Sequence, residues 1–307
     1  MDTPASTTAN GFFGSPPEPI FNESKNGLSR ELLQESLKLL ALKNEAAVSK
    51  NEQDETEGCF KTNNPVLFLF ELSRHFGLRP EVQYSAAELF HRFMLSHIIE
   101  LYDHVEESQT TENPIQWVDV ENRLKHQIVL RAVSCVQLAS KLSSHYSIVS
   151  LGRAKAFLTS CGFRYATSSI VQSEVRVLKT LDFKVHQHPT PVEFVEALLG
   201  ALGHNDKEIP VKQLHGIALK VLDVFYLCRG KVFSKLQKVA GPEKSSSAAA
   251  IEADLMLLSA AVITAAAFIL DQSNSDYIIQ HLSQITCIVN EDILNFASVL
   301  LEEIFSD

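Results

Sequence analysis

The sequence lacks the residue patterns that most enzymes and metal sites require. It contains no GxxxxGK[ST] phosphate loop, no HExxH zinc motif and no GxSxG nucleophile elbow. Its five cysteines are scattered, form no CxxC pair and stand in no recognisable nucleophile motif. Such cysteine usage is typical of a reduced, intracellular protein without a disulfide framework. We therefore expect no catalytic residue, no metal and no cofactor.

The sequence also lacks an apolar run long enough to cross a membrane. The strongest candidate, Leu255–Leu270, has 16 residues and is bounded by Asp254 and Asp271. A spanning helix takes about 20 residues, so this alanine-rich stretch is predicted to be a buried helix. Residues 1–20 contain no basic region followed by an apolar run, and we expect no signal peptide there.

Excess positive charge is absent as well. The chain carries 37 acidic and 27 basic residues, a net charge of −10, which disfavours a protein that coats nucleic acid. Alternating strand patterns are missing, whereas 45% of the 307 residues are hydrophobic, enough for a sizeable core. The composition thus predicts an all-α protein.

The segment His126–Leu142 is the centre of the predicted fold. It has only two formal charges, Arg131 and Lys141, and its apolar residues recur on nearly every face of a helix. A helix that is apolar all round is a buried one. Small residues, among them Ala132 and Ala139, let neighbouring helices pack closely against it. We expect residues 128–142 of this helix and the helix at 254–271 to be the least exposed in the molecule.

The helical patterns predict two tandem five-helix bundles with one helix before them. The Pro-rich segment His186–Pro191 separates the bundles, and Thr190-Pro-Val-Glu193 starts the next helix with a capping box. An acidic loop of unknown role is expected at 103–113, and the last helix of the first bundle is expected to start with the capping-box spacing Ser169–Gln172. The predicted division is a disordered tail at 1–27, an N-terminal helix and connector at 28–64, and bundles at 65–186 and 187–307.

Two charged residues stand in apolar surroundings. Lys141 closes the central helix, and Glu174 has Ile170 and Leu178 four residues to either side. Their charges can complement a helix C-terminus and a helix N-terminus, respectively. They can also form a binding site for a partner, and the residues alone leave both interpretations open. His91, His97 and His104 are expected to be ordinary side chains at a helix edge.

Three segments resemble motifs of the cyclin box. Leu138-Ala-Ser-Lys141 is similar to the LASK motif, and Tyr84–Met94 resembles the cyclin helix that ends in DRFL. Glu174-Val-Arg-Val-Leu-Lys-Thr-Leu-Asp-Phe183 resembles E-x-x-V-L-x-x-L-x-F. They occur in the cyclin order, and the similarity is clear over 60–185 and extends in helix layout to 305. The segment 132–142 is similar to the matching segment of a divergent, meiosis-associated branch of that family.

The resemblance implies a kinase-binding site. In cyclins the Lys of LASK and the Glu of the fifth helix bind main-chain groups around the kinase's regulatory helix, with apolar side chains beside them. The matching positions here are Lys141 and Glu174, with Leu142, Leu178 and Phe183 as the apolar contacts. An ion pair ringed by apolar groups can form hydrogen bonds with the exposed main chain of a partner. Loss of one member of the pair leaves the other unpaired.

The function implied is that of a non-catalytic regulator of meiotic recombination. It would promote crossover formation and maturation by binding a cyclin-dependent kinase, in the nucleus at meiotic chromosomes and also in the cytoplasm. The alternative is a cyclin-fold scaffold that recruits recombination or DNA-processing proteins without a kinase. A third interpretation, an enzyme, lacks any catalytic set. Neither membrane nor direct nucleic-acid binding is expected.

The sequence departs from cyclins at three places. LASK is followed by Leu142-Ser-Ser144 instead of an aromatic residue and two acids, and His91 replaces the Asp of DRFL. The substrate-docking motif MRAIL has no counterpart in Lys61–Phe70, where Thr62 lies near the position that the arginine of MRAIL would take. The Asp and Arg that pair in cyclins are both missing, which disfavours docking of the usual Arg-x-Leu substrates and leaves the kinase itself unidentified.

Overall fold

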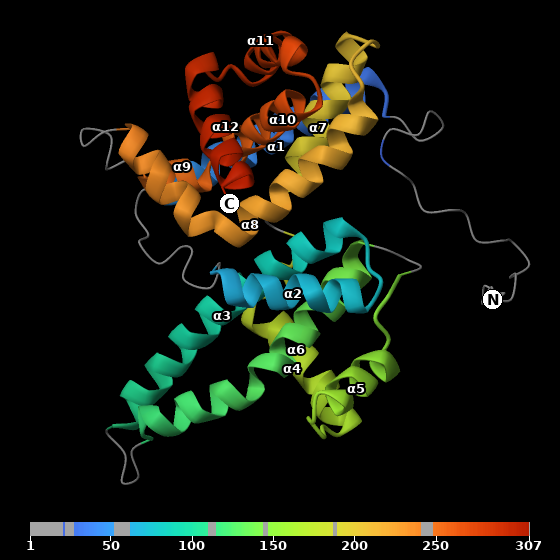
Figure 1. The fold of residues 1–307 in the computed structure, drawn as a ribbon. Coiled ribbons are helices and arrows are strands. Elements are labelled where there is room, and N and C mark those ends of the chain that lie inside the picture. Colours follow the sequence, from blue (N-terminus) through green and yellow to red (C-terminus); the bar gives the residue numbers. More distant parts are fainter. Residues whose placement is uncertain are drawn as a thin grey trace, which may run out of the picture.

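The computed structural model describes residues 21, 28–51, 62–109, 115–143, 147–186, 189–240 and 248–306. Within these ranges the secondary structure consists of α-helices with one short 3-10 turn and no strand, so the all-α prediction is confirmed. Figure 1 shows two helical bundles, one formed by the cyan-to-green part of the chain and one by the yellow-to-red part. The expected tail at 1–27 and most of the connector at 51–64 fall outside the described residues.

The N-terminal bundle surrounds one central helix. Its helices are α2 (Asn63–His75), α3 (Pro80–Ser108), α4 (Trp117–Ser143), α5 (Leu151–Ser160) and α6 (Thr167–Thr180). Helix α4 packs against each of the other four, and its residues 132–140 are all buried. The prediction of a buried central helix at 126–142 is therefore confirmed for residues 132–140. It is wrong at the start of that segment, where Ile128 is 39% exposed, because this part of α4 extends beyond the core of the bundle.

The C-terminal bundle repeats this plan. Its helices are α7 (Pro191–Asn205), α8 (Val211–Ala240), α9 (Ala248–Ala253), α10 (Leu255–Leu270), α11 (Ser275–Thr286) and α12 (Asn290–Phe305), with a 3-10 turn at Gln272–Asn274. Helix α10 packs against α7, α8, α11 and α12, and residues 258–267 are all buried. The alanine-rich segment is thus a core helix. No helix in the described ranges is long and apolar enough to cross a bilayer.

The helix before the N-terminal bundle, α1 (Arg30–Asn51), packs on the C-terminal bundle. It contacts α7, α9 and α10. A Cβ atom on Gly200 of α7 would lie 3.1 Å from Leu33 Cδ1, so the missing side chain permits the close approach. Asn44 also caps α10, since its amide donates to Asp254 Oδ1 at 2.9 Å and its carbonyl oxygen accepts from Met256 N at 3.2 Å.

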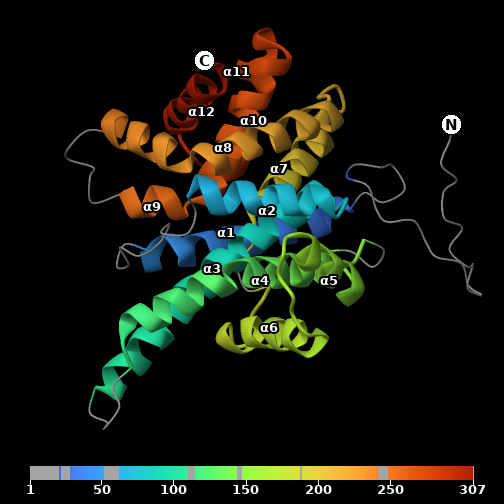
Figure 2. The same cartoon turned by 60° about the horizontal axis from the view of Figure 1, so that its bottom comes forward.

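The two bundles meet where α2 and α3 face α8 (Figure 2). Tyr84 of α3 is fully buried, and its hydroxyl lies 2.8 Å from both Leu219 O and Asp223 Oδ1 of α8. Tyr226 of α8 donates to Glu88 Oε1 at 2.9 Å. Buried hydroxyls and a carboxylate that are bonded across an interface hold it in one register. The predicted bundle boundary at 186 stays a prediction, because residues 187 and 188 lie outside the described ranges.

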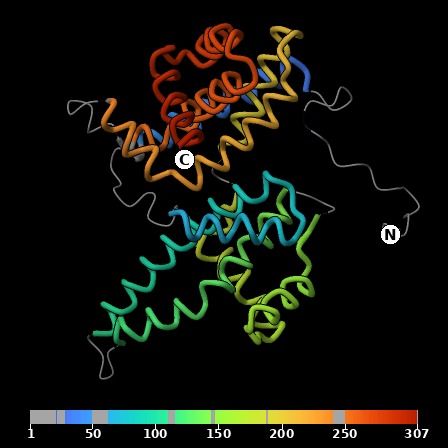
Figure 3. Tube along the Cα trace, in the orientation of Figure 1, coloured from blue at the N-terminus to red at the C-terminus, as the bar shows by residue number. Residues whose placement is uncertain are grey.

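The predicted acidic loop at 103–113 is partly wrong. Helix α3 continues through Ser108, and α4 begins at Trp117. The two helices form an antiparallel arm that projects from the N-terminal bundle, which Figure 3 traces at lower left. Tyr102 and Trp117 are in edge-to-face contact across it, with ring centroids 6.3 Å apart. This pairing, together with good helix formers such as Glu106, keeps the acidic segment helical.

Two predicted capping boxes have different outcomes. At α7, Thr190 N donates to Glu193 Oε1 at 2.9 Å, and the capping box is present as predicted. At α6 the prediction is wrong, because the helix begins at Thr167 with Ala166 as N-cap, and Ser169 lies inside its first turn. Spacing alone cannot distinguish a cap from a residue inside the first turn when several Ser and Thr residues adjoin.

Candidate functional site

Lys141 and Glu174 form an ion pair that joins the end of α4 to the middle of α6. Lys141 Nζ donates to Glu174 Oε1. The lysine side chain is 42% exposed and the glutamate side chain 15% exposed. Glu174 is the eighth residue of α6, not part of its first turn, so it does not complement the helix N-terminus. The helix-end interpretation therefore fails for Glu174 and remains available only for Lys141, in the last turn of α4.

Small hydroxyl residues set the register of the two helices. Ser134 of α4 donates to Ser173 of α6 at 2.7 Å, and both are buried. Serine also lets the helix backbones approach more closely than a larger side chain would. Lys141 follows Ser134 by two helical turns, and Glu174 directly follows Ser173. The ion pair between Lys141 and Glu174 thus adds a second contact between the same two helices.

Apolar side chains surround the ion pair. Leu178 shares one face of α6 with Glu174, Val171 and Val175 by helical periodicity. Val171 and Val175 are exposed, whereas Leu142 and Leu178 are half-buried and pack against the core. The sequence interpretation missed the two valines. A helical wheel of α6 finds them, since they lie three residues before and one residue after Glu174.

The end of α6 presents Phe183 to solvent. Asp182 and Phe183 have φ angles of 51° and 58°. Phe183 N donates to Leu178 O at 2.8 Å and Asp182 N to Lys179 O at 3.0 Å, which is the Schellman pattern of helix termination. The turn brings Phe183 back toward Leu178, and its side chain stays 65% exposed. An exposed phenylalanine in a bonded turn is suited to contact with a partner.

The five residues predicted from the resemblance thus lie at the end of α4, along one face of α6 and in the turn that ends α6, and the two valines share that face of α6. We call Lys141, Leu142, Val171, Glu174, Val175, Leu178 and Phe183 the α4–α6 surface. Lys141 keeps donors and Glu174 keeps acceptors for main-chain groups of a second protein. An exposed pair of this kind contributes about 0–1 kcal/mol to folding, and more once a partner excludes water.

Burial holds two other reactive groups, Cys135 and His97, in their uncharged forms. Burial raises the pKa of the Cys135 thiol, which keeps that thiol protonated. The histidine prediction is wrong for His91 and His97, which are buried instead of lying at the helix edge. Burial, with Arg176 and Arg131 nearby, lowers the pKa of His97 to about 4, so its ring is neutral at pH 7. In the described ranges no three His, Cys, Asp or Glu side chains are grouped as a metal site requires.

Comparisons with known proteins agree with this geometry. Residues 46–186 match the family described as cyclin, N-terminal domain. Cyclin N-terminal domain-containing protein 1 of Mus musculus is 34% identical over 282 residues, which cover 89% of this chain and 84% of the mouse protein. The Homo sapiens protein of the same name is 32% identical over 288 residues, with coverages of 89% and 84%. With this identity over most of both lengths, and with the helical bundle and motif positions described above, the chain belongs to the cyclin-like family of cyclin N-terminal domain-containing protein 1.

Proposed function

We propose that this protein is a non-catalytic regulator of meiotic recombination that promotes crossover formation and maturation by binding a cyclin-dependent kinase. It acts in the nucleus, at meiotic chromosomes. Family membership supports a regulatory role based on protein–protein contact. The observation that carries the kinase proposal is the α4–α6 surface, where the Lys141–Glu174 pair stands among exposed apolar side chains.

The surface offers what a kinase's regulatory helix and its flanking loop require. Val171, Val175 and Phe183 provide apolar area that is exposed in the free protein. Burying such area is favourable by about 25 cal/mol per Å², and a desolvated charge pair bonded to main-chain groups adds specificity. Helix α6 presents both features on one face, so a single partner helix can meet them together.

Kinase capture tests the proposal. Lys141→Ala or Glu174→Ala should weaken binding to a panel of cyclin-dependent kinases at least about tenfold, since loss of one member of an interfacial charge pair costs about 2–5 kcal/mol. Phe183→Ala should do the same without lowering the melting temperature, because the ring is exposed. Melting curves on the same preparations separate binding from folding, and the half-exposed pair should cost at most about 1 kcal/mol of stability.

The matched control is the Lys125–Glu121 pair, an exposed ion pair of 2.8 Å on the arm portion of α4. Lys125→Ala and Glu121→Ala should leave kinase capture unchanged. If both α4–α6 variants capture kinase as well as the unmodified protein does, the site is wrong. In meiotic cells, the Lys141→Ala form should fail to restore crossover numbers when it replaces the unmodified protein.

The second candidate is a cyclin-fold scaffold that recruits recombination or DNA-processing proteins without a kinase. It is favoured by Leu142, which packs against the protein's own core at the position after LASK where cyclins present an aromatic residue. If the unmodified protein captures no kinase but retains recombination proteins from meiotic extracts, this candidate replaces the first.

A further inference from the structure

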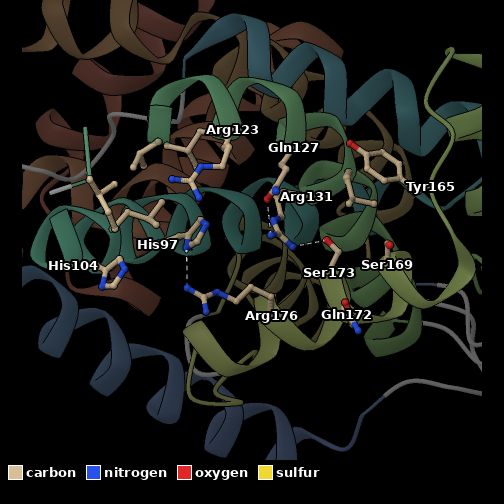
Figure 4. A pocket seen from close by; sticks show the side chains of 15 residues that line it. His97, His104, Arg123, Gln127, Arg131, Tyr165, Ser169, Gln172, Ser173 and Arg176 are labelled. Atoms are coloured by element: carbon tan, nitrogen blue, oxygen red, sulfur yellow. Dashed lines mark hydrogen bonds between the residues drawn. The ribbon is translucent and has the colours of Figure 1, made fainter. Parts of the chain in front are cut away.

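A basic pocket lies between the arm and α6, on the side of α6 away from Glu174. Its volume is about 510 Å³, and α3, α4 and α6 all contribute to its wall. The wall contains three arginines, Arg123, Arg131 and Arg176, and no aspartate or glutamate. Figure 4 shows these three side chains converging with His97. Three cations around one hollow are unexpected in a chain with a net charge of −10.

Arg131 is the least exposed of these three arginines, and among the described residues it has no carboxylate partner. It donates to Ser173 Oγ at 2.8 Å and to Gln127 Oε1 at 2.9 Å, both of which are neutral groups. Its Nε atom is buried and has no hydrogen-bond partner. In the part of the chain that the structure describes, no ion pair joins Arg131 or Arg123 to an acidic side chain. Arg131 is half-buried, and a partly desolvated cation without a counter-ion is stabilised when an anion reaches it.

The pocket's charges also oppose one another. Burial is the main cause that lowers the pKa of Arg131 and of His97. Arg176 lowers the pKa of Arg131 further, and both arginines lower the pKa of His97 further. Glu100, outside the wall, accepts from Arg176 at 3.0 Å and is the one described carboxylate that pairs with any of the three. An arrangement in which like charges repel until a ligand arrives is typical of a binding site.

We propose that this pocket binds a phosphorylated serine or threonine side chain of a protein partner. A phosphate monoester carries a charge of about −1.5 to −2 and three strong acceptor oxygens, which matches guanidinium groups with free donors. A single carboxylate would leave most of the positive charge uncompensated. The pocket is larger than a phosphate group, and Leu101, Ile115 and Leu124 line its arm side, where they can cover the peptide that carries it.

This inference does not rest on kinase binding. Arg176, Ser173 and Gln172 lie on a different face of α6 from Glu174, Val175 and Leu178, so the pocket and the α4–α6 surface can be occupied together. The chain's negative net charge disfavours a long polyanion such as DNA, which would be repelled outside the pocket. The experiment therefore uses the full chain alone, without a kinase.

The first measurement is the affinity for a peptide set of random sequence around a fixed phosphoserine. The set without phosphate and a set with glutamate in its place are the comparison ligands. The phosphorylated set should bind at least about tenfold more tightly than either, as expected for charge-assisted hydrogen bonds to arginine. Inorganic phosphate should bind the same site more weakly. Equal affinity for the phosphorylated and glutamate sets would overturn the proposal, and so would equal affinity for free phosphate and the peptide.

Charge-matched double variants locate the site. Arg123→Gln with Arg176→Gln removes two exposed cations of the wall, one on α4 and one on α6. Lys125→Gln with Lys179→Gln removes two cations from the same helices outside the wall. The first pair should weaken peptide binding at least about tenfold and the second less than about twofold. Equal effects would mean that general electrostatic attraction binds the peptide, which would overturn a built pocket.

The His97 ring gives an independent readout. Saturation with the phosphorylated peptide should raise the pKa of His97, followed by NMR titration of its ring protons, because a nearby dianion favours the charged form. No change in the titration of His97 would place any bound phosphate elsewhere and overturn the proposal. Tighter binding of a DNA oligonucleotide than of the peptide set would also overturn it and make the pocket a nucleic-acid contact.

Discussion

At the scale of single residues, the alanines of α10 leave no room for a charge. Ala261 and Ala265 are fully buried between the helices around them. Ala261→Asp should therefore lower the free energy of unfolding by several kcal/mol, since a buried carboxylate without a partner is strongly unfavourable. Denaturant titration followed by circular dichroism measures the loss. Ala41→Asp, at an exposed position of α1, should cost no more than about 0.7 kcal/mol, the difference in helix propensity. Similar losses in both variants would mean that α10 is not core.

His97 predicts a pH dependence of stability. Its folded-state pKa of about 4 lies below the value of about 6.5 expected in the unfolded chain. Between these values the unfolded state binds more protons, so the free energy of unfolding falls as the pH is lowered from about 6.5 to about 4. Arg176 and Arg131 oppose the charged ring, while Glu100 lies 3.8 Å from its Nδ1 atom.

The measurement is the urea midpoint at pH 7 and at pH 5. His97→Gln should reduce the difference between the two midpoints, because the glutamine cannot take up the proton. His104→Gln, on the exposed part of the same helix, should leave the difference as it is in the unmodified protein. An unchanged difference in the His97 variant would show that another titrating group causes the loss of stability.

At the scale of elements, the α3–α4 arm should open before the rest of the molecule unfolds. Beyond His97, only Ser108 of α3 is buried, and before Leu130 only Val120 of α4 is buried. Segments with so few buried contacts open locally at low cost. Trp117 is the single tryptophan of the chain and lies on the arm, so its fluorescence reports this opening. The fluorescence transition in urea should precede the transition in circular dichroism, and coincident curves would show that the arm is as stable as the bundles.

Hydrogen exchange distinguishes the two halves of α4. Residues 132–140 and, in α10, residues 258–267 should be the most protected amides in the described parts of the chain, because they are continuously buried. Residues 117–129 should exchange much faster, although they belong to the same helix. Mass spectrometry of peptides from these segments resolves the difference. Fast exchange at 132–140 would contradict a central α4.

Apolar periodicity predicted the helical class and the two central helices, because it records which side chains face the core. The pairing of Lys141 with Glu174 was implied by the match to cyclin motifs, since the residues alone left a helix-end role open. The arm was not predicted, since its packing depends on a contact between Tyr102 and Trp117 that helical periodicity does not encode. The basic pocket was missed for a similar reason. Arg123 and Arg131 lie on α4 and Arg176 lies far along the chain on α6, so the three resemble ordinary surface charges until the two helices are placed side by side.

At the scale of the whole molecule, buried hydrogen bonds connect the two bundles. Tyr84→Phe removes the hydroxyl that donates a hydrogen bond to the Asp223 carboxylate. Burial already raises the pKa of Asp223, and the variant leaves this carboxyl group with one hydrogen-bond partner fewer. The variant should lose about 1–3 kcal/mol of stability, the cost of an unsatisfied buried polar group. Tyr102→Phe, at an exposed tyrosine, should lose almost nothing. Calorimetry of both variants makes the comparison, and equal melting temperatures would show that the interface does not depend on this bond.

The position of α1 has a practical consequence for dissecting the protein. Helix α1 and the segment from α7 onward belong to one bundle. The N-terminal bundle, α2 to α6, is therefore inserted in the chain between two parts of the C-terminal bundle. Similarity to the cyclin N-terminal domain begins at residue 46, inside α1. A fragment cut there would discard Leu33, which fills the space over Gly200, and Asn44, which caps α10. Damage would therefore appear in the C-terminal bundle, although its segment from α7 onward is left intact. Truncations are better made upstream of Phe21, whose ring stacks on His215 of α8 with centroids 4.2 Å apart.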